Sequence, residues 1–166
     1  GLTILKGAVM FGLDPSVVTV RKSRMTYGVG VLNRFIHGRH PKSKMVKREG
    51  YEWCTDIFDK FVTTDQSVAL GDTVIRSYTP AKPGQKSSII HIYSSERSNP
   101  QFITDKGVKK CGTLCLDLNN IQYNQPTPKR REIQTRMTFG DTYIKVTALD
   151  VATGKSVRAS VDFLNK

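Results

Sequence analysis

Three cysteines and three histidines are the side chains best suited to nucleophilic attack or metal binding: Cys54, Cys111, Cys115, His37, His40 and His91. His37 and His40 could in principle bind zinc together with Cys54, but the spacing matches no known ligand pattern. No neighbouring residue would specifically lower a thiol pKa and so create a reactive cysteine. We therefore predict no metal site and no catalytic residue in this chain.

The acidic residues and glycines also lack a pattern that carries out a reaction. The fourteen carboxylates are scattered, and none forms a local pair suited to acid–base catalysis. Gly28-Val-Gly30 lacks the third glycine and the helix of a dinucleotide loop, and no phosphate-binding Lys-Ser/Thr motif occurs. The sequence thus favours a binding function without a cofactor in this chain.

The cysteines indicate a reducing compartment. Their odd number does not suggest a disulfide framework, and a strand would separate the Cα atoms of Cys111 and Cys115 by roughly 13 Å. No Asn-x-Ser/Thr sequon and no apolar run near the ~20 residues of a membrane helix occur. We expect a cytoplasmic location, with the nucleus as an alternative, and no transmembrane segment.

A net charge of +12 is the outstanding bulk property. It either serves solubility or indicates an acidic partner, such as nucleic acid or an anionic membrane. The most basic segment holds a candidate basic patch of Arg39, Lys42, Lys44, Lys47 and Arg48. The nearby aromatic residues, Phe35, Tyr51 and Trp53, could stack on bases, or Trp53 could anchor the segment by packing beneath it.

The elements that must position these residues begin with one expected helix. Residues 2–13 carry an apolar stripe at helical spacing, which Asp14-Pro15 ends. The stripe has no partner in its own segment, so we interpret residues 1–15 as the end of a preceding domain. If left uncovered, the stripe would form a homodimer. Residues 16–24 are expected to be an extended linker.

Residues 25–166 are predicted to form an antiparallel β-sandwich of about eight strands, because apolar and polar residues alternate through most of it. Gly140-Asp141 and Thr153-Gly154 predict tight turns between the last three strands. Residues 34–56 interrupt the alternation and predict a long basic insertion. Residues 73–78 and 88–93 predict a hairpin whose connection is either passive or reaches over a ligand.

Several separate blocks resemble the seventy-kilodalton heat-shock chaperones, in particular their atypical heat-shock 70 kDa protein 12 branch. Residues 137–155 resemble the family's last long hairpin, with its Asp-x-x-Thr-Gly-Lys turn, and residues 90–97 resemble the strand that ends in Gly-Glu-Arg. Residues 7–12 resemble the last helix of the ATPase domain. The blocks most typical of the branch are 13–15, 27–33, 65–71, 76–83 and 108–113.

The resemblance implies a substrate-binding domain that holds unfolded or extended polypeptide clients. It implies that ATP and magnesium bind to the chain's own ATPase domain, which precedes this one. The implied peptide-binding residues are Val29, Val31, Leu32, Tyr78, Ser88 and Ile90. Ser88 stands where the family usually has a branched apolar residue, so we expect a smaller and more polar pocket. The sequence does not include the helical lid that normally follows in the family, and without a lid we expect rapid exchange of the client.

Two hypotheses follow. The first is a chaperone module that binds extended peptides and is not itself an enzyme. The second is a basic adaptor that binds nucleic acid or anionic lipid through residues 39–48, with an affinity that falls steeply as salt rises.

Overall fold

Antiparallel β-strands make up nearly all the regular structure of residues 19–80, 84–119 and 131–163, which are the residues that the computed structural model describes. The strands are β1 (Val20–Lys22), β2 (Thr26–Arg34), β3 (Met45–Arg48), β4 (Tyr51–Val62), β5 (Ser67–Ala69), β6 (Thr73–Tyr78), β7 (Ser87–Ser95), β8 (Lys109–Asp117), β9 (Ile133–Phe139), β10 (Tyr143–Asp150) and β11 (Ser156–Asp162). A 3-10 turn, Lys42–Lys44, precedes β3. The predicted all-β class is confirmed, although short strands raise the count above the eight predicted.

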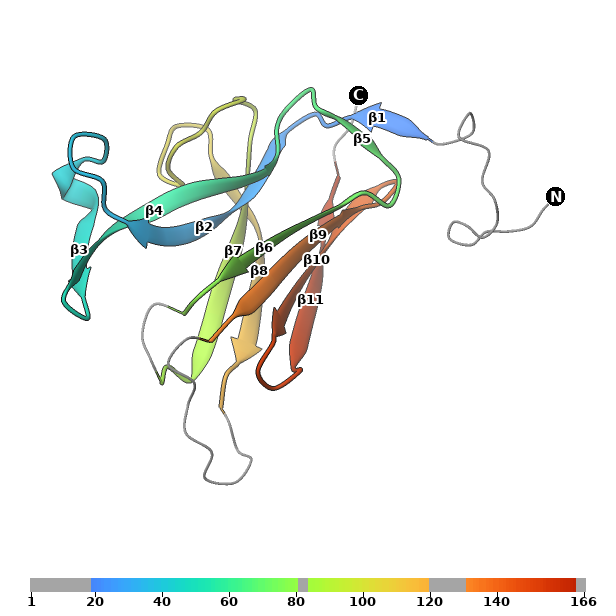
Figure 1. Ribbon diagram of the computed structural model, residues 1–166. Helices are drawn as coiled ribbons and strands as arrows, with labels where there is room; N and C mark the ends of the chain where they lie inside the picture. Colours follow the sequence, from blue (N-terminus) through green and yellow to red (C-terminus); the bar gives the residue numbers. More distant parts are fainter. Residues whose placement is uncertain (1–18, 81–83, 120–130, 164–166) are drawn as a thin grey trace.

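The strands form two main sheets with an apolar core between them (Figure 1). One sheet has the order β11-β10-β9-β6 and the other the order β3-β4-β2-β7-β8. In β9 the alternate residues Ile133, Thr135, Met137 and Phe139 are buried. The alternation and the turns predicted for the last three strands are confirmed, because β9, β10 and β11 pair in sequence.

The hairpin predicted from residues 73–78 and 88–93 is wrong. β6 pairs with β9 along its whole length, whereas β7 pairs with β2 and β8 in the other sheet. Both segments are strands, as predicted, but the connection between them crosses from one sheet to the other. Local sequence specifies that a segment is extended and does not specify which strand it pairs with.

The basic insertion predicted at about 34–56 is largely a hairpin. β3 pairs with the beginning of β4, and Glu49 and Gly50 form the turn with φ angles of 54° and 78°. Two positive φ angles are typical of the tight turns that match strand twist. β4 thus begins at Tyr51, inside the segment predicted to be an insertion.

The N-terminal region is described only in part. The helix predicted at residues 1–15, and the homodimer it would form, lie outside the described residues. Within the predicted linker, β1 pairs with β5, with Val20 opposite Ala69. This pairing gives the linker a defined contact with the segment that follows β4.

Candidate functional site

A fork in the five-stranded sheet opens a groove. β2 and β7 pair only from Thr26 opposite Ser95 to Val29 opposite Ile92. Beyond that point β2 stays on β4 and β7 stays on β8, so the two strands diverge (Figure 1). Among the described strands, none pairs with the inner edges of residues 30–34 and 87–91. These two edges border a groove of about 840 Å³.

All six residues predicted to bind peptide line this groove. Val31, Leu32, Tyr78 and Ser88 are half-buried and accessible from it. Val29 and Ile90 are 0% and 8% exposed and belong to the core, so they form its floor. The structure therefore brings the predicted residues together, although only four of them present much surface.

Sequence reasoning did not assign to the groove several residues that also line it: Arg34, Tyr51, Trp53, Asp56, Ile89, His91, Tyr93 and Arg131. Ile89 is the most exposed apolar side chain among them, at 58%. The aromatic side chains in β4 could have been found only by predicting that β4 pairs with β2. Arg131 could not have been assigned to the groove from the sequence, because it belongs to no recognisable motif.

Tyr78 ties one wall of the groove to the opposite sheet. It lies at the end of β6, and its hydroxyl donates a 2.6 Å hydrogen bond to the carboxylate of Asp59 on β4. Burial, the hydrogen bond to Asp59 and the negative charge of Asp59 raise the pKa of Tyr78 far above its ordinary value. Tyr78 therefore remains a neutral donor at every physiological pH.

Replacing Tyr78 with phenylalanine should lower the free energy of unfolding by about 1–3 kcal/mol, because Asp59 would lose its partner in a partly buried site. Urea denaturation would measure the change. Thr73→Val is a suitable control, since it removes an exposed 3.1 Å hydrogen bond to Thr138 at the other end of β6. Equal losses from both substitutions would show that the Tyr78 bond does not stabilise this wall.

The β3–β4 hairpin forms the opposite wall. Arg34 lies over the ring of Tyr51, with 4.2 Å from the guanidinium carbon to the ring centroid, and 5.4 Å from that of Trp53. The indole N–H of Trp53 donates to the carbonyl of Arg48 at 3.2 Å. Trp53 is half-buried and packs within the hairpin, as the anchoring alternative predicts, while its ring also lines the groove.

A bulge in β4 supports this wall. Between the pairs Val31–Ile57 and Asn33–Cys54, β4 has two residues, Thr55 and Asp56, opposite one residue of β2. Asp56 has a φ of 63°, a conformation that non-glycine residues rarely adopt. Lys44 holds Asp56 by a 3.2 Å ion pair and also donates to the Thr104 hydroxyl at 2.8 Å. Bulges of this kind redirect side chains at sites of function.

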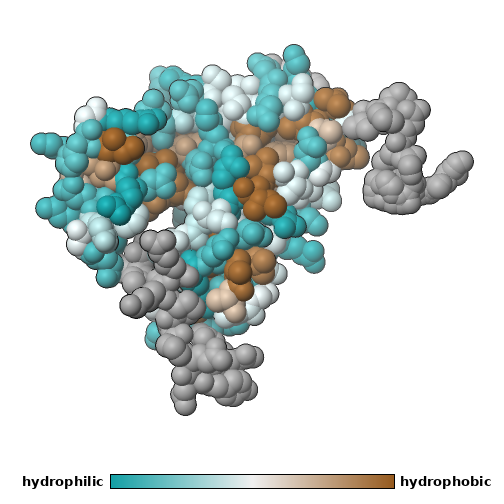
Figure 2. Space-filling model, in the orientation of Figure 1, coloured by the Kyte–Doolittle hydropathy of each residue, from teal (hydrophilic) through white to brown (hydrophobic). Residues whose placement is uncertain are grey.

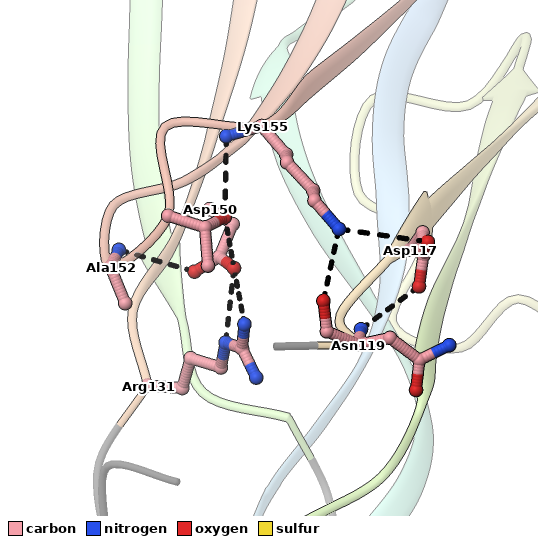
Figure 3. A network of polar contacts seen from close by, with 7 residues as sticks. Asp117, Asn119, Arg131, Asp150, Ala152 and Lys155 are labelled. Carbon is pink, nitrogen blue, oxygen red and sulfur yellow. Dashed lines mark hydrogen bonds and ion pairs between the residues drawn. The ribbon is translucent and has the colours of Figure 1, made fainter. Parts of the chain in front are cut away.

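A buried ion pair closes the other end of the groove. The Nε and Nη2 atoms of Arg131 donate to one carboxylate oxygen of Asp150 at 3.0 and 2.6 Å, and Asp150 is fully buried (Figure 3). The Thr153 hydroxyl and the Ala152 N–H also donate to Asp150. Lys155, on the same turn, reaches the Asn119 carbonyl at 2.9 Å and so ties β11 to the end of β8.

The five residues of the predicted basic patch lie in different environments. Lys44 is engaged with Asp56 and Thr104, and Arg48 is half-buried with an unpartnered Nε. Arg39, Lys42 and Lys47 are exposed. Figure 2 shows mainly hydrophilic side chains over the hairpin end of the molecule, on the left. Three of the five predicted residues are thus free to meet a solvent-borne partner.

The cysteines and histidines do not gather into one cluster. Among the described residues no three His, Cys, Asp or Glu side chains are placed to hold a metal ion. Burial raises the pKa of the Cys54 thiol, more than the Lys44 charge lowers it, so the thiol is a weak nucleophile. His91 is half-buried on β7, with Nδ1 3.1 Å from the Thr113 hydroxyl.

The chain is similar to heat shock 70 kDa proteins over almost all its length. It is 64% identical over 165 residues to heat shock 70 kDa protein 12A of Homo sapiens and of Mus musculus, and 58% identical over 169 residues to heat shock 70 kDa protein 12B of Homo sapiens. Each alignment covers 99% of this chain. The predicted resemblance is confirmed.

The chain spans about a quarter of the length of these heat shock 70 kDa proteins, 24% for 12A and 25% for 12B, and it matches a C-terminal part of them. No protein-family profile matches the chain. Among the residues that the structure describes, no helix is long and apolar enough to cross a membrane.

Proposed function

We propose that this domain binds extended polypeptide segments, as the substrate-binding β-sandwich of a heat-shock-70-like chaperone. The observation that carries the proposal is the fork between β2 and β7. Its two unpaired strand edges face one groove, and an extended guest could add main-chain hydrogen bonds to either edge. The similarity to heat shock 70 kDa proteins 12A and 12B supports the same function.

The energetics of such a complex require the strand edges. Burying one leucine side chain contributes roughly 1.5–3 kcal/mol, whereas micromolar affinity needs about −8 kcal/mol. Ser88 adds a hydroxyl to the groove, which limits the apolar contribution further. Main-chain hydrogen bonds must therefore supply much of the affinity, and selectivity for the central side chain should be weak.

In the whole protein we propose that ATP and magnesium bind to a separate ATPase domain, which controls the exchange of polypeptide clients here. This domain itself would catalyse no reaction. We propose a cytoplasmic location, with the nucleus as an alternative.

Peptide N-methylation provides the test. A fluorescein-labelled heptapeptide with a central leucine should bind in the micromolar range by fluorescence anisotropy. The same peptide with N-methyl groups on alternate residues should bind at least tenfold more weakly for one of the two alternating patterns, because about two hydrogen bonds of roughly 1 kcal/mol each are lost. The absence of saturable binding below roughly 1 mM, or equal binding of all three peptides, would contradict the proposal.

A second candidate function is binding to nucleic acid or anionic lipid. It is favoured by the exposure of Arg39, Lys42 and Lys47 on the hairpin and its preceding loop. Its affinity would fall steeply with salt and would not respond to N-methylation of a peptide. An oligonucleotide and a vesicle of anionic lipid, each titrated at two salt concentrations, would distinguish it from peptide binding.

A further inference from the structure

Arg34 lies over two aromatic rings at one end of the groove. Its guanidinium lies over Tyr51 and Trp53. Among the described residues, none forms a hydrogen bond or ion pair with the Arg34 side chain. The two rings attract the guanidinium and restrict its position, while its N–H groups can still donate to a planar, bidentate acceptor.

The segment around Arg34 carries a net positive charge. Residues 34–56 contain six lysine and arginine side chains against three carboxylates. Two of these carboxylates are already engaged: Glu52 with His37 at 2.7 Å and Asp56 with Lys44 at 3.2 Å. Glu49 has no such partner among the described residues; it is exposed at the hairpin turn and also lines the groove.

Arg34 also differs from the other arginine of the groove. Arg131 lies 6% exposed at the opposite end, with its charge balanced by Asp150. Arg34 is therefore the cation of the groove lining that has no ion-pair partner among the described residues, as Glu49 is its carboxylate without one, and the two ends of the groove are chemically different. A guest with a charged side chain would be bound in one preferred register.

We propose that Arg34 forms a carboxylate-binding subsite, which selects extended polypeptides with an aspartate or glutamate about three residues to one side of the residue in the groove centre. The spacing follows from β2, where Arg34 lies three residues beyond Val31 along the unpaired edge, or roughly 10 Å. The inference rests on the proposed peptide binding and adds to it a class of guest.

Four labelled peptides with a central leucine test the subsite: one neutral, one with glutamate three residues before the leucine, one with glutamate three residues after it, and one with lysine at both positions. One glutamate peptide should bind about three- to tenfold more tightly than the neutral peptide, and the lysine peptide more weakly. Arg34→Gln should abolish this difference. Arg34→Lys should retain only part of it, because the lysine ammonium cannot donate two parallel hydrogen bonds as the planar guanidinium does. Arg39→Gln, which removes a basic residue outside the groove, should change neither the affinity for the neutral peptide nor the gain from glutamate.

The outcomes separate the two proposals. If no peptide binds, the proposed peptide binding fails. If all four bind equally, or if the preference survives Arg34→Gln, peptide binding stands and the subsite is wrong. Equal gains from glutamate on both sides would assign the effect to net charge and overturn the subsite. A phosphoserine peptide that binds more than tenfold tighter than the glutamate peptide would overturn it in favour of a phosphate site.

Discussion

Asp150→Ala is expected to lower the free energy of unfolding by about 3–5 kcal/mol. The substitution would leave Arg131 as an unpaired charge in a site where its side chain is 6% exposed. It would also remove the acceptor of the Thr153 hydroxyl and the Ala152 N–H, which shape the turn between β10 and β11. Urea denaturation, followed by tryptophan fluorescence and circular dichroism, would measure the loss.

The controls separate a buried charge from an ordinary ion pair. Asp117→Ala breaks an exposed pair with Lys155 and should cost less than about 1 kcal/mol. The double variant Arg131→Met, Asp150→Leu should recover most of the stability, since no unpaired charge remains. If Asp150→Ala cost no more than Asp117→Ala, the buried pair would not stabilise this end of the groove.

Acid should affect the same pair. Burial alone would raise the pKa of Asp150, but the hydrogen bonds from Arg131 and Thr153 and the charge of Arg131 outweigh it, so the pKa lies below its ordinary value. The stabilisation is therefore complete above the unfolded pKa of about 3.9 and is lost as the pH falls through the lower folded pKa. The double variant should lose less stability than the wild type below about pH 4.

The sequence predicted best the strands whose two faces differ in environment. In β9 through β11 one face is buried and the other wet, and Gly154 supplies the positive φ that its turn requires. Pairing between distant strands could not be predicted in this way. The assignment of β6 to β9 depends on cross-strand contacts, such as Thr73 with Thr138, that adjacent sequence does not encode.

The glycines of β2 illustrate a motif whose cause becomes visible only in the fold. Gly28-Val-Gly30 does not form a dinucleotide loop. A Cβ atom at position 28 would lie 2.2 Å from the carbonyl oxygen of Asp59. The glycine thus permits the close approach of β2 and β4 at the base of the fork, a contact between residues 31 positions apart.

The groove residues were predicted only through the family resemblance, and not from the pattern of residue types. The six residues that the resemblance implied all line the groove, but Ile90 and Val29 lie mainly in the core. The Arg34 stack was missed because pairing of β2 with β4 places Arg34 opposite Trp53, which is 19 residues away. Composition indicated a basic and aromatic segment, and only pairing could show which cation covers which ring.

Leu32→Asp is expected to weaken binding of the leucine heptapeptide at least tenfold. Leu32 lies on the unpaired edge of β2, half-buried and outside the core cluster, so a carboxylate there remains hydrated in the free protein. A bound guest would strip water from that charge and set it against an apolar side chain, and this desolvation costs more than the lost contact alone. Fluorescence anisotropy would measure the affinity.

The choice of position decides whether the measurement reports on binding. Ile90→Asp would place a charge in the core and unfold the sandwich, because Ile90 is 8% exposed. Ile75→Asp is the matched control: Ile75 is 45% exposed on β6 and lies outside the groove lining. Both Leu32→Asp and Ile75→Asp should keep the free energy of unfolding within about 1 kcal/mol of the wild type. Unchanged affinity in Leu32→Asp, with the fold intact, would mean that an extended guest does not pass along the edge of β2.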